Sequence, residues 1–297
     1  MAVTDDRWNE FHGNTKLPED FTKFWNTLCR QDCQLPAAFE LKKRMTTAAA
    51  EYDDLSYMGL DGRTITTSYI RPLLQKPTAI VIDFHNTGRS SRGQFYLNRY
   101  TALGFSVMAP PCHPGITLGF SMSAGEEIQN QAACMAYREA FLAVRIAREL
   151  EPLLPVYTYG EGLGAALAVA CSGRAGVEKC AAQNPLLTDY RTVYELGYDT
   201  GYYETIRRYF RDIDGEHSHE EEFFGRLDYV DCLNFARFSK ASLLLGTGLL
   251  DEVSPAKGQY GLFHSAAGEK RHSVFPKHGH ERINFFENDA MEFFLER

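Results

Sequence analysis

A regular alternation of short apolar runs with helical segments begins at residue 79 and constrains the fold of this 297-residue chain more than any other feature. Continuous apolar runs are typical of strands that are buried on both faces. Residues 79–85 form such a run, and further strands are expected at residues 104–110, 154–159, 177–185, 241–249 and 272–276. Strands that alternate with helices predict an α/β fold with a doubly wound, mostly parallel sheet. In such a sheet, ligands bind beyond the carboxyl ends of the strands.

The remaining segments predict additions to this sheet within a single α/β-hydrolase-like domain over residues 1–297. Residues 17–45 are expected to be helical, because Phe21, Phe24, Trp25 and Leu28 would share one face. Tyr52–Met58 and Thr64–Ile70 alternate around the turn signal Asp61-Gly62, which predicts a hairpin. We therefore expect a helix and hairpin extension over 1–77. The Tyr- and Phe-rich residues 186–240 are expected to form a helical insertion or lid.

Residues 158–164, Thr-Tyr-Gly-Glu-Gly-Leu-Gly, lie between an apolar run and a helix of small residues. This strand–turn–helix context is that of the nucleophile elbow of an α/β hydrolase. However, the sequence has no Ser or Cys between Tyr157 and Ala170. The chain is therefore expected to keep a hydrolase scaffold without the atom that forms an acyl-enzyme.

An acid and a histidine follow the last two predicted strands. Asp251 follows the run 241–249, and His280 follows the run 272–276, together with His278. Their order along the chain matches the Asp…His half of a hydrolase triad, in which the acid orients the imidazole and the imidazole moves a proton. The plainer interpretations are a helix N-cap for Asp251 and a backbone-bonded loop histidine for His280.

The sequence resembles the acetyl xylan esterase / cephalosporin C deacetylase family of α/β hydrolases over nearly its whole length. The similar stretches are LPEDFTKFW (17–25), FHNTGR (84–89), ALAVAC (166–171), NPLLTDYRTVYEL (184–196), FFGRLDYVDCLNFA (223–236), GLLDEVSPA (248–256) and FPKHGHE (275–281). The resemblance implies the α/β-hydrolase fold. It also implies that Asp251 and His280 are the acid and base of the site.

The chain departs from this family at the site itself. Members of the family have Gly-Gly-Ser-Gln-Gly-Gly-Gly at the elbow, and the position of the serine here can be Gly160, Glu161 or Gly162. The loop that supplies an oxyanion-hole amide is shortened to residues 86–88, and the Arg-Gly-Gln segment becomes residues 111–114. These departures argue against the deacetylase mechanism of the family.

A site for acetylated substrates without a nucleophile is suited to β-elimination. In that reaction a base removes a C–H proton, a double bond forms, and acetate leaves. The chain resembles the α/β-hydrolase-like lyases of tetronate polyketide pathways, which make an exocyclic double bond in this way during antibiotic biosynthesis. We expect His280, oriented by Asp251, to be the base, with Glu161 as the alternative base or as the proton donor to acetate.

The substrate is expected to be held by the elbow and by the loop that follows the first parallel strand. The residues concerned are His85, Asn86, Thr87, Gly160 and Gly162. A structural role for His85 and a solvent-facing position for Glu161 are the alternatives. Two other functions stay open: an esterase or acyltransferase with an unusual mechanism, and a non-catalytic binding protein.

The net charge of −8 argues against nucleic acids and anionic membranes as partners, since both select for Lys/Arg-rich surfaces. The N-terminal residues lack the basic start and apolar core of a signal peptide, so a cytoplasmic location is expected. We expect no cofactor and no metal site, because no nucleotide-binding or zinc-site spacing is present. A homo-oligomer is expected from the family resemblance alone.

Overall fold

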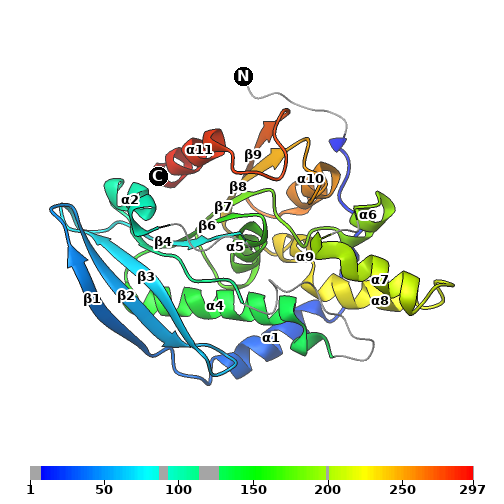
Figure 1. The fold of residues 1–297 in the computed structure, drawn as a ribbon, viewed down its shortest axis with the longest axis horizontal. Coiled ribbons are helices and arrows are strands. Elements are labelled where there is room, and N and C mark those ends of the chain that lie inside the picture. The colour runs from blue at the N-terminus through cyan, green and yellow to red at the C-terminus, as the bar shows by residue number, and fades with distance from the viewer. Residues whose placement is uncertain (1–7, 87–92, 114–126, 199–200, 297) are drawn as a thin grey trace.

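The computed structural model describes residues 8–86, 93–113, 127–198 and 201–296. In this part of the chain, nine strands form one sheet in the order β1-β2-β3-β5-β4-β6-β7-β8-β9 (Figure 1). The strands are β1 (Phe39–Thr46), β2 (Ala50–Met58), β3 (Thr64–Pro72), β4 (Ile80–Phe84), β5 (Ser106–Met108), β6 (Val156–Glu161), β7 (Lys179–Gln183), β8 (Ser242–Gly248) and β9 (Lys270–Phe275).

Neighbouring strands from β5 to β9 all pair in parallel. The expected α/β fold with a mostly parallel sheet is therefore confirmed. The carboxyl ends of β4, β6 and β7 lie side by side, because Phe84 pairs with Gly160 and Glu161 pairs with Gln183. Loops that follow these strands meet at one edge of the sheet, where the fold places its ligands.

The N-terminal strands extend the same sheet in antiparallel fashion. β2 and β3 form the expected hairpin. The expectation of a helix up to residue 45 was wrong beyond α1 (Phe21–Asp32), because β1 pairs with β2 along the edge of the sheet. β1 is exposed over nearly its whole length and carries Lys42, Lys43 and Arg44. Charged side chains of this kind protect an edge strand from pairing with other chains.

Helices cover both faces of the sheet. α1, α4 and α5 lie on one face, and α2 and α11 on the other (Figure 1). Phe21, Trp25 and Leu28 of α1 are buried, as the sequence pattern predicts. The helices flanking the sheet are α2 (Gln94–Ala102), α4 (Ala132–Leu150), α5 (Leu163–Arg174), α10 (Ala256–Ser265) and α11 (Asn284–Leu295), with a short 3₁₀ turn η2 (Ile128–Asn130) before α4.

The segment between β7 and β8 is helical, as expected. It contains α6 (Tyr190–Glu195), η3 (Gly201–Tyr203), α7 (Glu204–Asp212), α8 (Glu220–Leu227), η4 (Asp228–Val230) and α9 (Cys232–Ala236). α7 and α8 extend away from the sheet (Figure 1). Within the described part of the chain, no helix is both long and apolar enough to span a lipid bilayer.

Candidate active site

A single glycine makes the turn between β6 and α5. β6 ends at Glu161, α5 begins at Leu163, and Gly162 between them has φ 55° and ψ −115°, which residues with a side chain rarely adopt. In an α/β hydrolase the nucleophile occupies this strained turn. Of the three positions that the sequence leaves open, the backbone geometry therefore favours Gly162 over Gly160 and Glu161.

The strand and the helix of this turn approach each other too closely for larger residues. A Cβ atom on Gly160 would lie 2.2 Å from the backbone of Gly164, and one on Gly164 would lie 1.9 Å from the carbonyl oxygen of Phe84. Both glycines are needed for this packing. Gly160 therefore acts as a packing residue here rather than lining the site.

The side chain of Asn86 fills the space in front of Gly162. A Cβ atom on Gly162 would lie 2.5 Å from the Asn86 carboxamide. Asn86 Oδ1 accepts a hydrogen bond from the Leu163 N–H at 3.2 Å. In α/β hydrolases the N–H of the residue after the nucleophile is an oxyanion-hole donor. Asn86 thus occupies both the place of a nucleophile side chain and the place of the oxyanion.

Asp251 and His280 come together as the sequence predicts. Their loops follow β8 and β9, and His280 Nδ1 lies 2.9 Å from Asp251 Oδ2. The Asp251 side chain is fully buried, whereas that of His280 is 13% exposed. Asp251 Oδ1 accepts hydrogen bonds from the Val253 and Ser254 N–H groups at 2.8 and 2.7 Å. These bonds hold the carboxylate rigidly against the imidazole.

This pairing determines which His280 nitrogen faces the site. With Nδ1 donating to Asp251, Nε2 carries the lone pair of the ring and can accept a proton. Nε2 lies 3.4 Å from Asn86 Nδ2, which is a donor. The imidazole therefore presents a basic nitrogen toward the elbow, where a serine hydroxyl would otherwise lie.

Glu161 is buried at the end of β6 and is 9% exposed. The Tyr159 hydroxyl donates to its Oε1 at 3.1 Å. Burial, assisted by the negative charge of Asp83, raises the pKa of Glu161 to about 7. A solvent-facing Glu161 is therefore excluded. Near neutral pH, the carboxyl group can either donate or accept a proton.

A charged network behind Glu161 was not predicted from the sequence. Arg99 donates to Asp83 at 3.0 Å and to Glu287 at 3.1 Å, and Tyr100 donates to Asp83 at 2.8 Å. The one sequence signal was an aspartate inside the otherwise apolar run 79–85. Burial raises the pKa of Asp83, and when Asp83 is ionised beside Arg99 its negative charge disfavours ionisation of Glu161.

A pocket open to solvent joins these groups, with an empty volume of about 240 Å³. Its lining residues are Asn86, Glu161, Gly162, Gln183, Asn184, His280, Glu281 and Arg282. Four of them, Asn86, Glu161, Gly162 and His280, were singled out from the sequence. In the described residues this lining comes from strand ends and loops at the carboxyl ends of the strands, and none of it comes from α6–α9.

Sequence reasoning missed Gln183 and Asn184, which anchor the His280 loop. Gln183 donates to the Glu281 carbonyl oxygen at 2.6 Å and accepts from the Ile283 N–H at 3.1 Å. Asn184 donates to the Gly279 carbonyl oxygen at 2.9 Å. The available signal was a pair of polar amides directly after a buried strand, at the edge where ligands bind.

One other residue expected to bind substrate, His85, is placed differently. His85 Nδ1 lies 3.0 Å from the Asn86 carbonyl oxygen, and the His85 ring is not part of the described pocket lining. This arrangement agrees with a structural role for His85. Thr87 lies outside the described residues.

The comparisons with known proteins agree with this geometry. The sequence matches the acetyl xylan esterase (AXE1) family over residues 1–115 and 127–297. Acetyl xylan esterase 1 from Thermoanaerobacterium sp. JW/SL YS485 is 27% identical, with a TM-score of 0.86 and 99% of both chains covered. The acetyl xylan esterase from Paenibacillus sp. R4 is 21% identical, with a TM-score of 0.85 and 99% of both chains covered.

A more distant match shows the fold alone. The acylaminoacyl peptidase of Pyrococcus horikoshii is 15% identical, with a TM-score of 0.57, over 88% of this chain and 42% of that chain. The family match, in contrast, includes the elbow, the Asp251 loop and the His280 loop. This chain therefore belongs to the acetyl xylan esterase family of α/β hydrolases.

Proposed function

We propose that this protein cleaves acetate from an acetylated small molecule by proton transfer and forms no acyl-enzyme. The observation that carries the proposal is Gly162 at the nucleophile position, with the Asn86 carboxamide in front of it. The bend has no Ser or Cys side chain that could form an ester-type acyl-enzyme. The Asp251–His280 pair, in contrast, keeps the hydrogen bond that proton transfer requires.

Elimination of acetate is the reaction that these contacts favour. His280 Nε2 takes a proton from a carbon next to a carbonyl group, and the C–H electron pair forms a carbon–carbon double bond. The bond between the neighbouring carbon and the ester oxygen then breaks, and acetate leaves with that electron pair. This reaction needs neither a serine nor the Leu163 N–H as an oxyanion donor, and Asn86 already accepts from that N–H.

Glu161 and Arg282 fit the handling of the leaving group. Glu161 lines the pocket, and its pKa of about 7 lets it carry the proton that a departing acetate accepts. Arg282 brings a positive charge to the same pocket. A cation beside a developing carboxylate stabilises the negative charge of the transition state.

Hydrolysis of an acetyl ester is the second candidate, and membership of the acetyl xylan esterase family favours it. His280 would then activate a water molecule, which attacks the acetyl carbon directly. That water and the oxyanion both need space that Asn86 occupies. Hydrolysis therefore requires the Asn86 side chain to move away from Gly162, whereas elimination requires only that the 3.4 Å contact between Asn86 Nδ2 and His280 Nε2 gives way to the substrate C–H group.

Isotope labelling separates the two reactions. An acetylated hydroxymethyl tetronate and a simple aryl acetate are incubated with the protein in ¹⁸O-labelled water, and the products are analysed by mass spectrometry. Elimination breaks the alkyl–oxygen bond, so the released acetate contains no label and the other product has lost acetic acid. Hydrolysis breaks the acyl–oxygen bond, so the acetate gains one labelled oxygen.

The control variant is His278→Ala, which changes a neighbouring histidine that no hydrogen bond links to Asp251 in the described structure. Unlabelled acetate from wild type and His278→Ala, with none from His280→Ala, supports elimination. Labelled acetate with the same dependence on His280 supports hydrolysis and overturns elimination. Unchanged substrates would overturn both reactions and favour a binding protein.

A further inference from the structure

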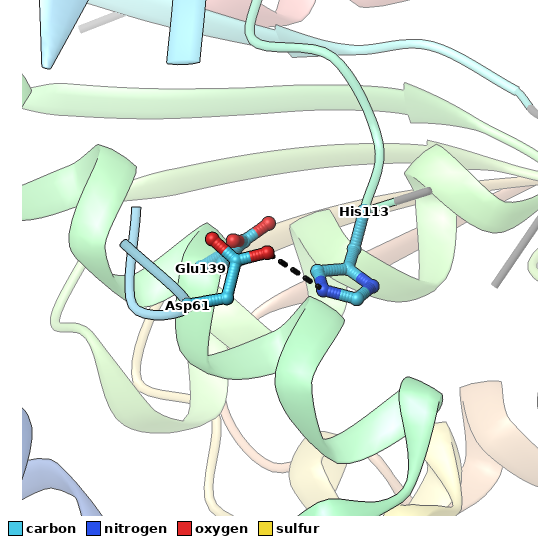
Figure 2. A group of neighbouring side chains, drawn as sticks. All are labelled: Asp61, His113 and Glu139. Atoms are coloured by element: carbon cyan, nitrogen blue, oxygen red, sulfur yellow. Dashed lines mark ion pairs between the residues drawn. The ribbon is translucent and has the colours of Figure 1, made fainter. Parts of the chain in front are cut away.

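A second group of side chains that can bind a metal lies apart from the His280 pocket. Asp61 lies in the turn between β2 and β3, His113 in the segment after β5, and Glu139 in α4. Figure 2 shows the three side chains pointing toward one another. Their nearest ligand atoms all lie within 4.8 Å of one another, and Asp61 Oδ2 is 3.8 Å from His113 Nε2.

The spacing of these atoms is close to that of a metal site. Ligands about 2.0–2.2 Å from a tetrahedral ion lie about 3.3–3.6 Å from one another. The distance of 3.8 Å between Asp61 and His113 needs only a small side-chain movement to reach that range. Three segments far apart in the sequence are thus already folded into a nearly complete ligand set.

The buried carboxylate of Glu139 supplies an independent indication of a ligand. Glu139 is 6% exposed, and within the described residues its Oε1 has no hydrogen-bond partner. Burial is the largest cause of a rise in its pKa to about 7. A buried acceptor without a partner is destabilising, and a bound ion or water would satisfy it.

The cluster borders a pocket. Glu139 and His113 line an open pocket whose empty volume is about 260 Å³, together with Tyr57, Phe84 and Cys112. The lining of this pocket shares no residue with that of the His280 pocket among the described residues. A ligand here would therefore be separate from the reacting substrate.

Arg63 is a positively charged neighbour of this cluster, and its hydrogen bonds leave one carboxylate oxygen of Glu139 available to a metal ion. Its guanidinium donates to Asp61 Oδ2 at 2.8 Å and to Glu139 Oε2 at 2.5 Å. Glu139 Oε1 stays outside these bonds. With both acids ionised, the two carboxylates and Arg63 together carry one net negative charge, which still attracts a cation. Arg63 would not bind the metal itself. Its hydrogen bonds would orient both carboxylates, as residues that contact metal ligands commonly do.

We propose that Asp61, His113 and Glu139 bind one divalent transition-metal ion, through one imidazole nitrogen and two carboxylate oxygens. This mixed nitrogen and oxygen set suits Zn²⁺, Co²⁺ and related ions better than Ca²⁺, which takes oxygen ligands only. Three protein ligands leave further positions for water or a small ligand from the pocket.

The test is a Co²⁺ titration of the full chain after treatment with EDTA, followed by visible absorption. We expect one equivalent to bind, with bands of a nitrogen- and oxygen-ligated ion. His113→Ala and Glu139→Gln should each weaken binding by at least about 100-fold. His278→Ala should bind like the wild type. Zn²⁺ should raise the Tm of the wild type and of His278→Ala, and leave the Tm of His113→Ala unchanged.

Folding and competing sites are checked in the same samples. The Tm of each variant without metal shows whether it folds, and Glu139→Gln keeps the shape of the side chain while removing its charge. Cys29 and Cys33 are free thiols outside the cluster. Thiolate-to-cobalt charge-transfer bands would assign the ion to cysteines and overturn the proposal. Absence of binding, or binding that both variants retain, would overturn it as well.

Discussion

The two sides of the His280 pocket differ in which catalytic groups of an α/β hydrolase they contain. On the β8–β9 side, Asp251 and His280 retain a complete hydrogen-bonded pair. On the β6 side, the backbone geometry favours Gly162 as the nucleophile position, and Asn86 fills the space before it. The comparison indicates that this scaffold can keep the groups for proton transfer while it lacks the group for covalent catalysis. The two sets of groups lie on different loops at the carboxyl ends of the strands.

Removal of the base should have the largest effect. His280→Ala deletes the imidazole that Asp251 orients, so turnover should fall by about 10²- to 10⁴-fold. The measurement is acetate release from the acetylated substrate, with His278→Ala as the control. Full activity of His280→Ala would show that the retained pair is not the catalytic side of the pocket.

Glu161→Gln tests the electrostatics of the elbow side. The folded-state pKa of Glu161 is about 7, above the ordinary value of 4.5, so the folded state binds more protons between these values. Its contribution to the free energy of unfolding therefore falls as the pH rises from about 4.5 to about 7, by about 3 kcal/mol at most.

The variant cannot ionise, so its stability should fall less than that of the wild type between about pH 5 and pH 8. Urea unfolding at both pH values measures the difference. Glu139→Gln is a matched control, since burial also raises the pKa of Glu139 to about 7 at a distinct pocket. An identical pH dependence in Glu161→Gln and wild type would contradict a buried, proton-holding Glu161.

Introducing a serine at position 162 tests whether Asn86 obstructs the elbow. Gly162→Ser alone places a side chain at φ 55° and 2.5 Å from the Asn86 carboxamide, which should destabilise the protein by about 1–3 kcal/mol. No covalent adduct with a fluorophosphonate is expected in this variant. The double variant Asn86→Gly/Gly162→Ser opens the space beside His280 and should form the adduct.

Asn86→Gly alone is the control for the double variant, since it opens the space without adding a nucleophile. Intact-mass spectrometry detects the adduct, and thermal unfolding measures stability. Equal labelling of the single and double serine variants would show that Asn86 does not obstruct the elbow. Labelling of the wild type at this bend would overturn the serine-free account.

The smallest effect is expected when the hydrogen bonds between Gln183 and the His280 loop are removed. Gln183→Met keeps the size of the side chain but leaves the Glu281 carbonyl oxygen and the Ile283 N–H without their partner. We expect a loss of about 1–3 kcal/mol in stability and a lower kcat. The exposed Gln34→Met is the matched control. If kcat is unchanged while stability falls, Gln183 supports the fold and does not position His280.

Local sequence signals were sufficient for most of the sheet and for one side of the site. Continuous apolar runs located the parallel strands, and their order placed Asp251 and His280 after β8 and β9. The signal failed for β1, which is a nearly fully exposed edge strand without the apolar pattern of its neighbours. Its structure comes from pairing with β2, which is a contact between segments and not a property of residues 39–46 alone.

The sequence by itself determined the absence of a nucleophile near the elbow and the order of acid and base, because both are properties of residue type and position. Only the tertiary structure decided that Gly162 is the tip of the bend, that Asn86 fills the space before it, and that Glu161 is buried. It also brought Asp61, His113 and Glu139 together. These features depend on packing between segments distant in the chain, and burial and proximity alter the chemistry of a side chain without changing the sequence pattern around it.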